Sequence, residues 1–227
     1  MLDGPEGRHA ATVSRLGTGE AVVLVDGDGR RGTGIVVAVT GTDVVEVDVA
    51  DVVSEPRPEP WLVVVQAVPK GDRGETAVET MTEVGVDEVV PWAASRCVTR
   101  WREGRGDKAL SRWRTTAAAA AKQSRRSRFP VVADLATTAA VAQRLGGAAS
   151  ALLLHEEASA PLASFAPPST GEVVVVVGPE GGLSPEELSA FEAAGASAYR
   201  LGPTVLRTST AGTAALAVLL ARTPRWG

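Results

Sequence analysis

The sequence has few residues of the kinds that carry thiol, metal or imidazole chemistry. Its 227 residues include one cysteine, two histidines and one tyrosine, and aromatic residues (FWY) amount to 4%. The single cysteine, Cys97, excludes an intramolecular disulfide. No group of cysteine, histidine and carboxylate residues has the spacing of metal ligands, so the sequence predicts no metal site.

Long apolar runs are also missing. No run approaches the roughly 20 residues that cross a bilayer as a helix. The first residues do not combine a basic region with an apolar stretch, as a secretory signal would. We therefore expect a cytoplasmic protein without a membrane partner. With 44% hydrophobic residues, the chain can bury one large core or two smaller ones.

The net charge of -4 argues, on average, against binding to nucleic acid, but the charge is unevenly distributed. Between Arg96 and Arg128 there are eleven Lys or Arg against two acids, Glu103 and Asp107. This segment therefore carries +9, and the rest of the chain carries -13. One interpretation is a solvated basic helix and loop. The other is a surface that contacts RNA phosphates, with Arg96, Arg125, Arg126 and Arg128 as the candidate RNA-binding residues.

The pattern divides the chain into two domains. Short β-type runs at 21–25, 34–39 and 44–49 are separated by turn signals and predict a small antiparallel barrel. The alternating prolines of 56–60 cannot continue a strand ladder and predict a stiff linker. We therefore expect one domain at 1–57 and a second at 58–227.

The second domain has the pattern of an α/β fold. Apolar runs at 61–68, 89–92, 151–154 and 173–177 predict buried strands, and helical spacing occurs at 74–84 and 107–123. Strands that alternate with helices indicate a parallel sheet with helices on both faces. His155 follows one of these strands, at the sheet edge where ligands bind in such folds.

The most informative strand is Val173–Val177, because a glycine turn follows it directly. The turn is Gly178-Pro179-Glu180-Gly181-Gly182, whose glycines allow positive φ and let a ligand approach the backbone. Ser184 and Glu187 then form a capping box, Pro185 takes the first helical position, and Gly195 ends the helix. A strand, a glycine turn and a capped helix predict a ligand-binding loop.

A second turn, Gly202-Pro203, follows about twenty residues later. We expect Thr208 and Thr210 to cap the alanine-rich helix that runs to about Ala221. Together the two turns are expected to form two walls of one pocket. Neither turn has the spacing of a Walker loop or of a dinucleotide-binding fingerprint, which disfavours a nucleotide-phosphate binder.

The two turns resemble a known motif pair. Gly-Pro-Glu-Gly-Gly at 178–182, followed by Leu-Gly-Pro-x-x-Leu-Arg-Thr-x-Thr-Ala at 201–211, is similar to the C-terminal motifs of the RsmE family. These are 16S ribosomal RNA uridine-N3 methyltransferases of the SPOUT superfamily. The stretch from His9 to Glu20, and Lys70 with Glu83-x-Gly85-Val86, also resemble that family.

The resemblance implies a fold and its partners. It implies a SPOUT-type sheet with a C-terminal deep trefoil knot, a PUA-like N-terminal barrel and a homodimer. The cofactor would be S-adenosyl-L-methionine (SAM), and the substrate 16S ribosomal RNA or the small ribosomal subunit. Relatives usually carry a further strand before the position of Met1, so we expect the barrel to be truncated at its start or completed otherwise.

The resemblance also implies site residues. Arg207 and Glu180 are the candidate catalytic residues. The candidate cofactor-binding residues lie on the two turns and at the end of the strand before His155: Leu154, His155, Gly178, Pro179, Gly181, Gly182, Leu201, Gly202, Leu206, Thr208 and Thr210. One position departs from the family, because Ser209 stands where relatives usually have a glutamate. The alternative function is a non-catalytic RNA-binding ribosome-assembly factor.

Overall fold

The computed structural model describes residues 1–102 and 104–226, and the chain folds into two compact units. Unit 1 consists of Met1–Arg57 together with Arg126–Arg128. Unit 2 consists of Pro58–Arg125 and Phe129–Gly227. Glu103, one of the two acids in the basic segment, lies outside the described residues.

Unit 1 is a three-stranded antiparallel sheet with two short helices. Its elements are α1 (Gly4–Arg8), the π-helix η1 (His9–Val13), β1 (Ala21–Val25), β2 (Arg30–Thr40) and β3 (Val44–Ser54). The strand order is β1-β2-β3, so among the described residues β2 pairs with both neighbours and the sheet is open. The sequence predicted a small barrel here, and the three expected strands form without closing one. The small core contains Ala10, Val36 and Val45.

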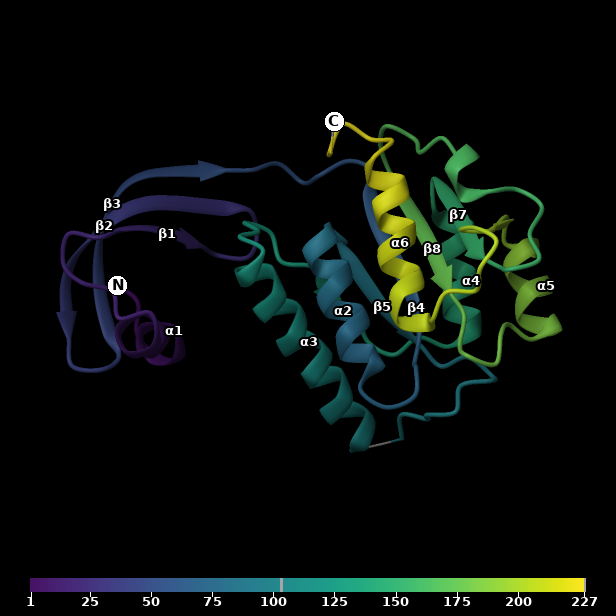
Figure 1. Ribbon diagram of the computed structural model, residues 1–227, viewed down its shortest axis with the longest axis horizontal. Coiled ribbons are helices and arrows are strands. Elements are labelled where there is room, and N and C mark those ends of the chain that lie inside the picture. Colours follow the sequence, from purple (N-terminus) through teal and green to yellow (C-terminus); the bar gives the residue numbers. More distant parts are fainter. Residues whose placement is uncertain (103, 227) are drawn as a thin grey trace. The chain divides into compact units, whose positions relative to one another are not determined.

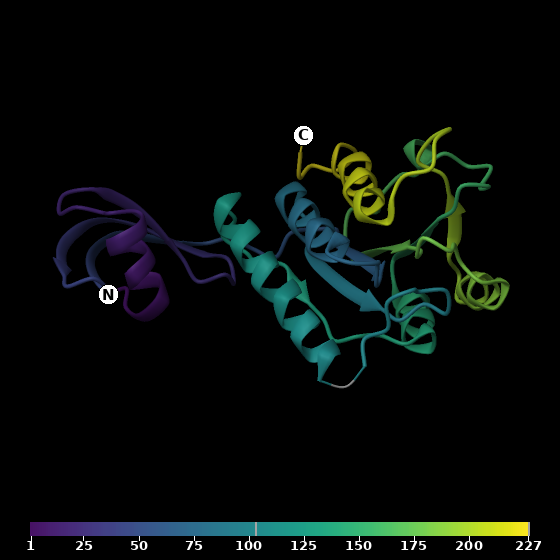
Figure 2. The same ribbon diagram turned by 60° about the horizontal axis from the view of Figure 1, so that its bottom comes forward.

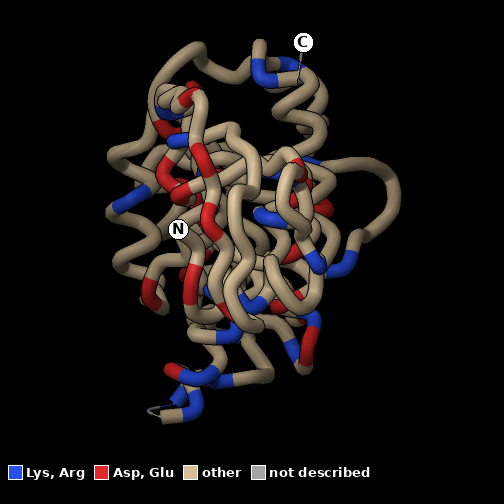
Figure 3. The backbone as a smooth tube through the Cα atoms, turned by 90° about the vertical axis from the view of Figure 1, so that its left-hand side faces the viewer, with Lys and Arg blue, Asp and Glu red and all other residues tan. Residues whose placement is uncertain are grey.

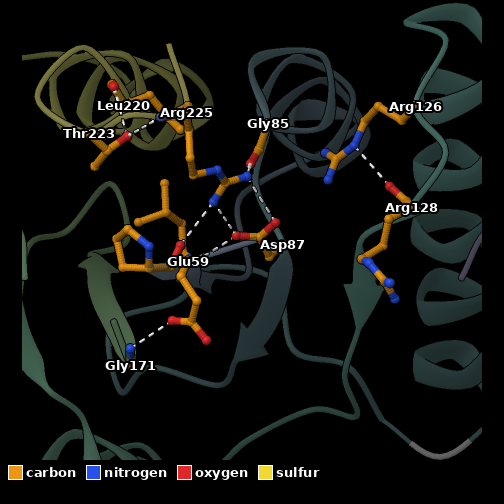
Figure 4. A network of polar contacts seen from close by, with 11 residues as sticks. Glu59, Gly85, Asp87, Arg126, Arg128, Gly171, Leu220, Thr223 and Arg225 are labelled. Atoms are coloured by element: carbon orange, nitrogen blue, oxygen red, sulfur yellow. Dashed lines mark hydrogen bonds and ion pairs between the residues drawn. The ribbon is translucent and has the colours of Figure 1, made fainter. Parts of the chain in front are cut away.

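A distant segment completes unit 1. The backbone N–H of Gly29 donates to the carbonyl of Ser127 at 3.1 Å. The Arg128 guanidinium donates to the carbonyl of Glu55 at 3.2 Å. Arg126 Nε donates to the carbonyl of Arg128 at 3.0 Å, as Figure 4 shows. Sequence patterns did not predict the contact between Glu55 and Arg128, because these residues are 73 positions apart in the sequence.

Unit 2 is a parallel α/β sheet of six strands in the order β6-β5-β4-β8-β7-β9 (Figures 1 and 2). The elements follow in chain order: β4 (Trp61–Ala67), α2 (Arg73–Val84), β5 (Glu88–Trp92), α3 (Arg105–Gln123), β6 (Val131–Val132), α4 (Thr138–Gly147), β7 (Ser150–Leu154), η2 (Leu162–Ser164), β8 (Glu172–Val177), α5 (Pro185–Ala193), β9 (Ser197–Tyr199) and α6 (Thr208–Leu220). The expected strands, helices and parallel sheet are confirmed. The knot stays a prediction.

Helices cover both faces of this sheet. All seven residues of β4 are buried, as expected for a central strand. Leu62 and Val64 face α2, α3 and α6, whereas Val63 and Val65 face α4 and α5. Helices α2 and α6 approach closely, because a Cβ on Gly212 would lie 2.5 Å from Met81 Sδ. None of the described helices is both long and apolar enough to cross a membrane.

Paired charges lie at the amino end of the sheet. Asp87, 1% exposed, accepts hydrogen bonds from the Leu62 N–H at 2.8 Å and from the Arg225 guanidinium at 2.5 and 3.0 Å. The same guanidinium donates to the carbonyl of Gly85 (Figure 4). This fork holds the chain after α6 against the start of β5.

A second cluster lies at the same end. Arg144 contacts Glu88 at 2.5 Å and Glu172 at 3.2 Å, which are the first residues of β5 and β8. The hydrogen bond to Glu88 raises the pKa of the Arg144 guanidinium. Both clusters therefore join strand starts to the helical layer through charge-assisted contacts.

Candidate functional site

A cavity of about 320 Å³ lies at the carboxyl ends of β7 and β8. Ligand pockets commonly have roughly 300 to 1,000 Å³. The end of β7 contributes Leu154 and His155, the turn after β8 contributes Gly178, and the segment after β9 contributes the opposite wall. Because β8 lies between β4 and β7, the cavity is close to the point where the strand order reverses.

The first turn is built as the sequence predicted. Gly182 has φ +71° and its N–H donates to the Pro179 carbonyl at 2.9 Å. The capping box is present, with Ser184 accepting from the Glu187 N–H and donating its own N–H to the Glu187 carboxylate. The buried Glu187 also accepts from the Ser95 N–H at 2.7 Å, which ties the turn to the loop after β5.

The glycines of the two turns differ in backbone conformation. Of the three in the first turn, Gly182 has a positive φ, and Gly178 and Gly181 do not. Gly202 is also outside the positive-φ region. What distinguishes Gly202 is space: a Cβ there would meet nothing within 4 Å, although the residue lines the cavity. A Cβ at Gly202 would therefore stand in open space on the cavity wall and would clash with no protein atom.

The second wall begins after β9 and is held by backbone hydrogen bonds. Arg200 pairs with the 160–162 segment at 2.8 and 2.9 Å, and the His155 N–H donates to the Tyr199 carbonyl at 3.0 Å. Thr208 Oγ1 donates to the Gly178 carbonyl at 3.3 Å and so joins the two walls.

The predicted caps of α6 were wrong. The helix begins at Thr208, its N-cap residue is Arg207, and no side chain caps it. Thr208 bonds to the Gly178 carbonyl, and Thr210 Oγ1 donates to the Arg207 carbonyl at 3.2 Å. Both hydroxyls therefore act as donors to carbonyls instead of accepting from the free N–H groups of the first turn.

Most of the predicted cofactor residues lie together in the structure. The following nine line the cavity: Leu154, His155, Gly178, Pro179, Gly182, Leu201, Gly202, Leu206 and Thr208. Gly181 and Thr210 are not among the lining residues. Gly181 faces Arg96 instead, since its carbonyl accepts from the Arg96 guanidinium at 3.1 Å and a Cβ there would lie 3.2 Å from Arg96 Cβ.

Both candidate catalytic residues line the cavity, in different surroundings. Glu180 accepts from the Lys70 N–H at 3.2 Å and pairs with Arg73 at 3.5 Å. The Glu180 carboxylate therefore joins the first turn to the loop after β4. Arg207 is exposed, and its guanidinium has no partner among the residues that the structure describes.

Sequence reasoning missed several lining residues, of which the charged ones are Arg73, Glu156 and Arg200. Arg200 directly precedes the second motif and Glu156 follows His155, so adjacency could have suggested both. Arg73 opens α2, far from either motif, and no local pattern marks it. With Arg207 and Glu180, the wall carries three arginines and two glutamates.

Metal and thiol chemistry find no support at this site. Within residues 1–102 and 104–226, no group of His, Cys, Asp and Glu could hold a metal ion. Cys97 does not line this cavity, and burial raises the pKa of its thiol, which disfavours the thiolate that a cysteine nucleophile needs.

The candidate RNA-binding arginines are divided between the two units and have different local contacts. Arg96 contacts Gly181, and Arg125 is exposed with φ +58°. Arg126 and Arg128 belong to unit 1, where Arg128 contacts Glu55. Lys and Arg gather instead around the start of α3, at the bottom of Figure 3.

Two family descriptions match the sequence. Residues 56–220 match an RNA methyltransferase domain, and residues 2–48 match an RNA methyltransferase PUA domain. The matches cover most of the chain.

Curated relatives and solved structures agree with these matches. "Ribosomal RNA small subunit methyltransferase E" of Mycobacterium tuberculosis is 46% identical, over 100% of this chain and 87% of the relative. The Bacillus subtilis protein of the same name is 29% identical, over 96% and 88%. The structure of the Neisseria gonorrhoeae protein of that name, bound to S-adenosyl methionine, has a TM-score of 0.83 and 25% identity, over 97% of this chain and 91% of that chain. The chain belongs to the RsmE family of ribosomal RNA small subunit methyltransferases.

Proposed function

We propose that this protein transfers a methyl group from SAM to N3 of a uridine in the 16S RNA of the small ribosomal subunit. The chain is a SAM-dependent ribosomal RNA methyltransferase by family, and relatives of known structure hold SAM. The observation that supports the proposal most strongly is the cavity in which the two family motifs form opposite walls.

The cavity residues fit the chemistry of SAM. Leu154, Leu201 and Leu206 offer apolar walls for an adenosine ring system, and the glycine turns offer backbone donors and acceptors. Gly202 leaves open a space that any larger residue would fill. When bound, SAM would supply an electrophilic methyl group. Gly181 and Thr210 would support the walls from behind instead of touching the cofactor.

The chain's own residues must favour loss of the uridine N3 proton. If the pKa of N3 lies about two units above neutral pH, exposing the anion costs roughly 2.7 kcal/mol. The unpartnered guanidinium of Arg207, on the cavity wall of the described chain, can stabilise charge that develops on a uracil carbonyl. Backbone N–H groups of the turns would add to this, and orientation of the base would lower the barrier further.

Glu180 has a positioning role in this account. Its carboxylate joins the first turn to Lys70 and Arg73, at the beginning of α2. Serine at 209 cannot take a proton near neutral pH, and its side chain is buried. The N3 proton would therefore leave to solvent, while Arg207 stabilises the uracil anion.

Further features of the family belong to the same proposal. Residues 1–57 would act as a PUA-like module that helps to hold RNA, and residues 58–227 as the knotted catalytic domain. Helix α6 is apolar around much of its circumference and carries half-buried Ala214, Ala217 and Val218, which a second subunit of a homodimer would cover. We place the protein in the cytoplasm, where its proposed substrate is assembled.

The test is methylation in vitro with labelled SAM, followed by mass mapping of the RNA. Free 16S RNA and unmodified small subunits would be offered in parallel. We expect one N3-methyluridine, formed only when SAM and enzyme are both present. A protein that binds RNA yet neither binds SAM nor transfers a methyl group would instead be the RNA-binding assembly factor considered above.

A further inference from the structure

Two further cavities lie at the carboxyl end of the sheet in unit 2, and one tryptophan lines both. The first, of about 250 Å³, is bordered by Trp101, Trp113 and the arginines 100, 105 and 112. The second, of about 500 Å³, shares Arg100 and Trp101 with the first. We call the first the tryptophan cavity. Trp101 therefore borders both cavities.

The two tryptophans have different roles. Trp113, 2% exposed, is fixed in α3 and packs so closely on α2 that a Cβ on Gly74 would lie 2.5 Å from its ring. Trp101 is half-buried and meets Trp113 edge to face, with ring centroids 5.1 Å apart and an interplanar angle of 78°. The buried ring of Trp113 therefore packs against and supports the half-buried ring of Trp101.

The rim of the tryptophan cavity is positively charged. Arg112 pairs with Glu75 at 3.1 Å. Arg100 and Arg105 are exposed and have no side-chain partner within the described parts of the chain. The nearby Asp107 is engaged by the Gly104 N–H at 3.2 Å. Two guanidiniums thus remain available for an anionic ligand.

The tryptophan cavity adjoins the cavity between the two glycine turns, which we call the cofactor cavity. Arg73 lines the cofactor cavity, and the next two residues of α2, Gly74 and Glu75, line the tryptophan cavity. A strand of RNA whose target base enters the cofactor cavity would therefore bring a neighbouring nucleotide to the tryptophan cavity. Unpaired RNA bases are held in proteins by stacking on aromatic rings or arginine planes, with basic side chains on the phosphates.

We propose that Trp101 stacks on an unpaired base next to the target uridine, while Arg100 and Arg105 contact the phosphates of that nucleotide. This inference rests on the proposed function and adds a second base-binding site to it. Stacking is tolerant of base identity, so the site would hold the RNA strand in place, and the cofactor cavity would select the uridine.

The experiment compares RNA binding by four proteins: wild type, Trp101→Leu, Trp101→Phe and Trp226→Leu. Trp226 is 53% exposed and outside both cavities, so it is the matched control. The probes are a 16S transcript and unmodified small subunits, each titrated by filter binding with S-adenosylhomocysteine present to prevent turnover. Calorimetric titration with SAM is run on all four proteins.

We expect Trp101→Leu to weaken RNA binding by about tenfold, since loss of a stacked base typically weakens binding about 5- to 150-fold. Trp101→Phe should retain most of the affinity, and Trp226→Leu all of it. SAM affinity should be unchanged throughout. The inference is overturned if Trp101→Leu binds both probes like wild type, or if Trp101→Phe loses as much as Trp101→Leu.

A second variant keeps the proposal testable if Trp101→Leu does not fold. Arg100→Gln with Arg105→Gln changes two exposed side chains and should reduce the slope of log affinity against log salt by about 1.5. An unchanged slope would remove the phosphate contacts from the proposal and overturn it. Failure of the proposed function can be distinguished from failure of this inference. If the wild type binds RNA but transfers no methyl group, the RNA affinities of the wild type and the Trp101 variants can still be compared.

Discussion

The two ends of the sheet in unit 2 use charge in opposite ways. At the amino end, Asp87 pairs with Arg225, and Arg144 bridges Glu88 and Glu172. These groups are largely buried and each has its partner. At the carboxyl end, arginines line three cavities, and Arg207 has no partner in the described chain.

This difference separates stability from ligand binding. Buried pairs at the amino end fix the strand starts, so their loss should cost folding energy. Exposed, unpaired guanidiniums at the carboxyl end contribute little to folding and remain available for anions. Mutations at the two ends should therefore affect different measurements.

The largest effect on stability is expected from Arg225→Leu. It would leave the buried Asp87 carboxylate without the guanidinium that pairs with it, and breaking such a buried pair costs about 3 to 5 kcal/mol. Urea denaturation would measure the free energy of unfolding. Arg222→Leu, an exposed change in the same C-terminal segment, should be close to neutral. An equal effect of both variants would contradict the role of the Asp87 pair.

A smaller effect, on activity, is expected at Glu180. Glu180→Gln can still accept from Lys70 but loses the charge that pairs with Arg73, so we expect a rate about fivefold lower. The loss should be the same at each pH, since the residue positions the turn. Recovery at raised pH would show that Glu180 accepts the proton.

Ser209→Glu tests whether a carboxylate at this position accepts the N3 proton. It restores the family's usual carboxylate at a residue that is buried and does not line the cofactor cavity. We expect a folded variant with little change in rate, checked by denaturation and by methyl transfer at saturating SAM and RNA. A large increase in rate would return the general-base role to this position.

The smallest effect is expected at Arg125. Arg125→Ala removes one exposed guanidinium and should reduce the salt slope of RNA binding by about 0.7 to 0.9. Arg128→Ala is the contrasting change, because its guanidinium contacts the Glu55 carbonyl and its loss should destabilise unit 1. An unchanged slope for Arg125→Ala would make this part of the basic segment an ordinary solvated surface.

Local patterns predicted much of unit 2 and little of what joins its distant parts. The valines 173–177 and the spacing of Ser184 and Glu187 determine a strand and a capped helix within a few residues. The contact of Asp87 with Arg225 joins residues 138 positions apart. The edge-to-face contact of Trp101 with Trp113 depends on how α3 packs against α2, and no sequence period encodes that packing. The motif pair identified the cofactor cavity, but Arg73 enters it only through the fold.

The central claim is that the cavity between the two glycine turns holds SAM, and Gly202→Val tests it most directly. A matched change, Gly147→Val, also introduces a side chain where a Cβ would meet nothing within 4 Å, but at the end of α4 and outside the cavity. By calorimetric titration with SAM, we expect Gly202→Val to lose about 100-fold in affinity and Gly147→Val to bind like wild type, with both proteins folded. Undiminished SAM affinity in Gly202→Val would contradict the account.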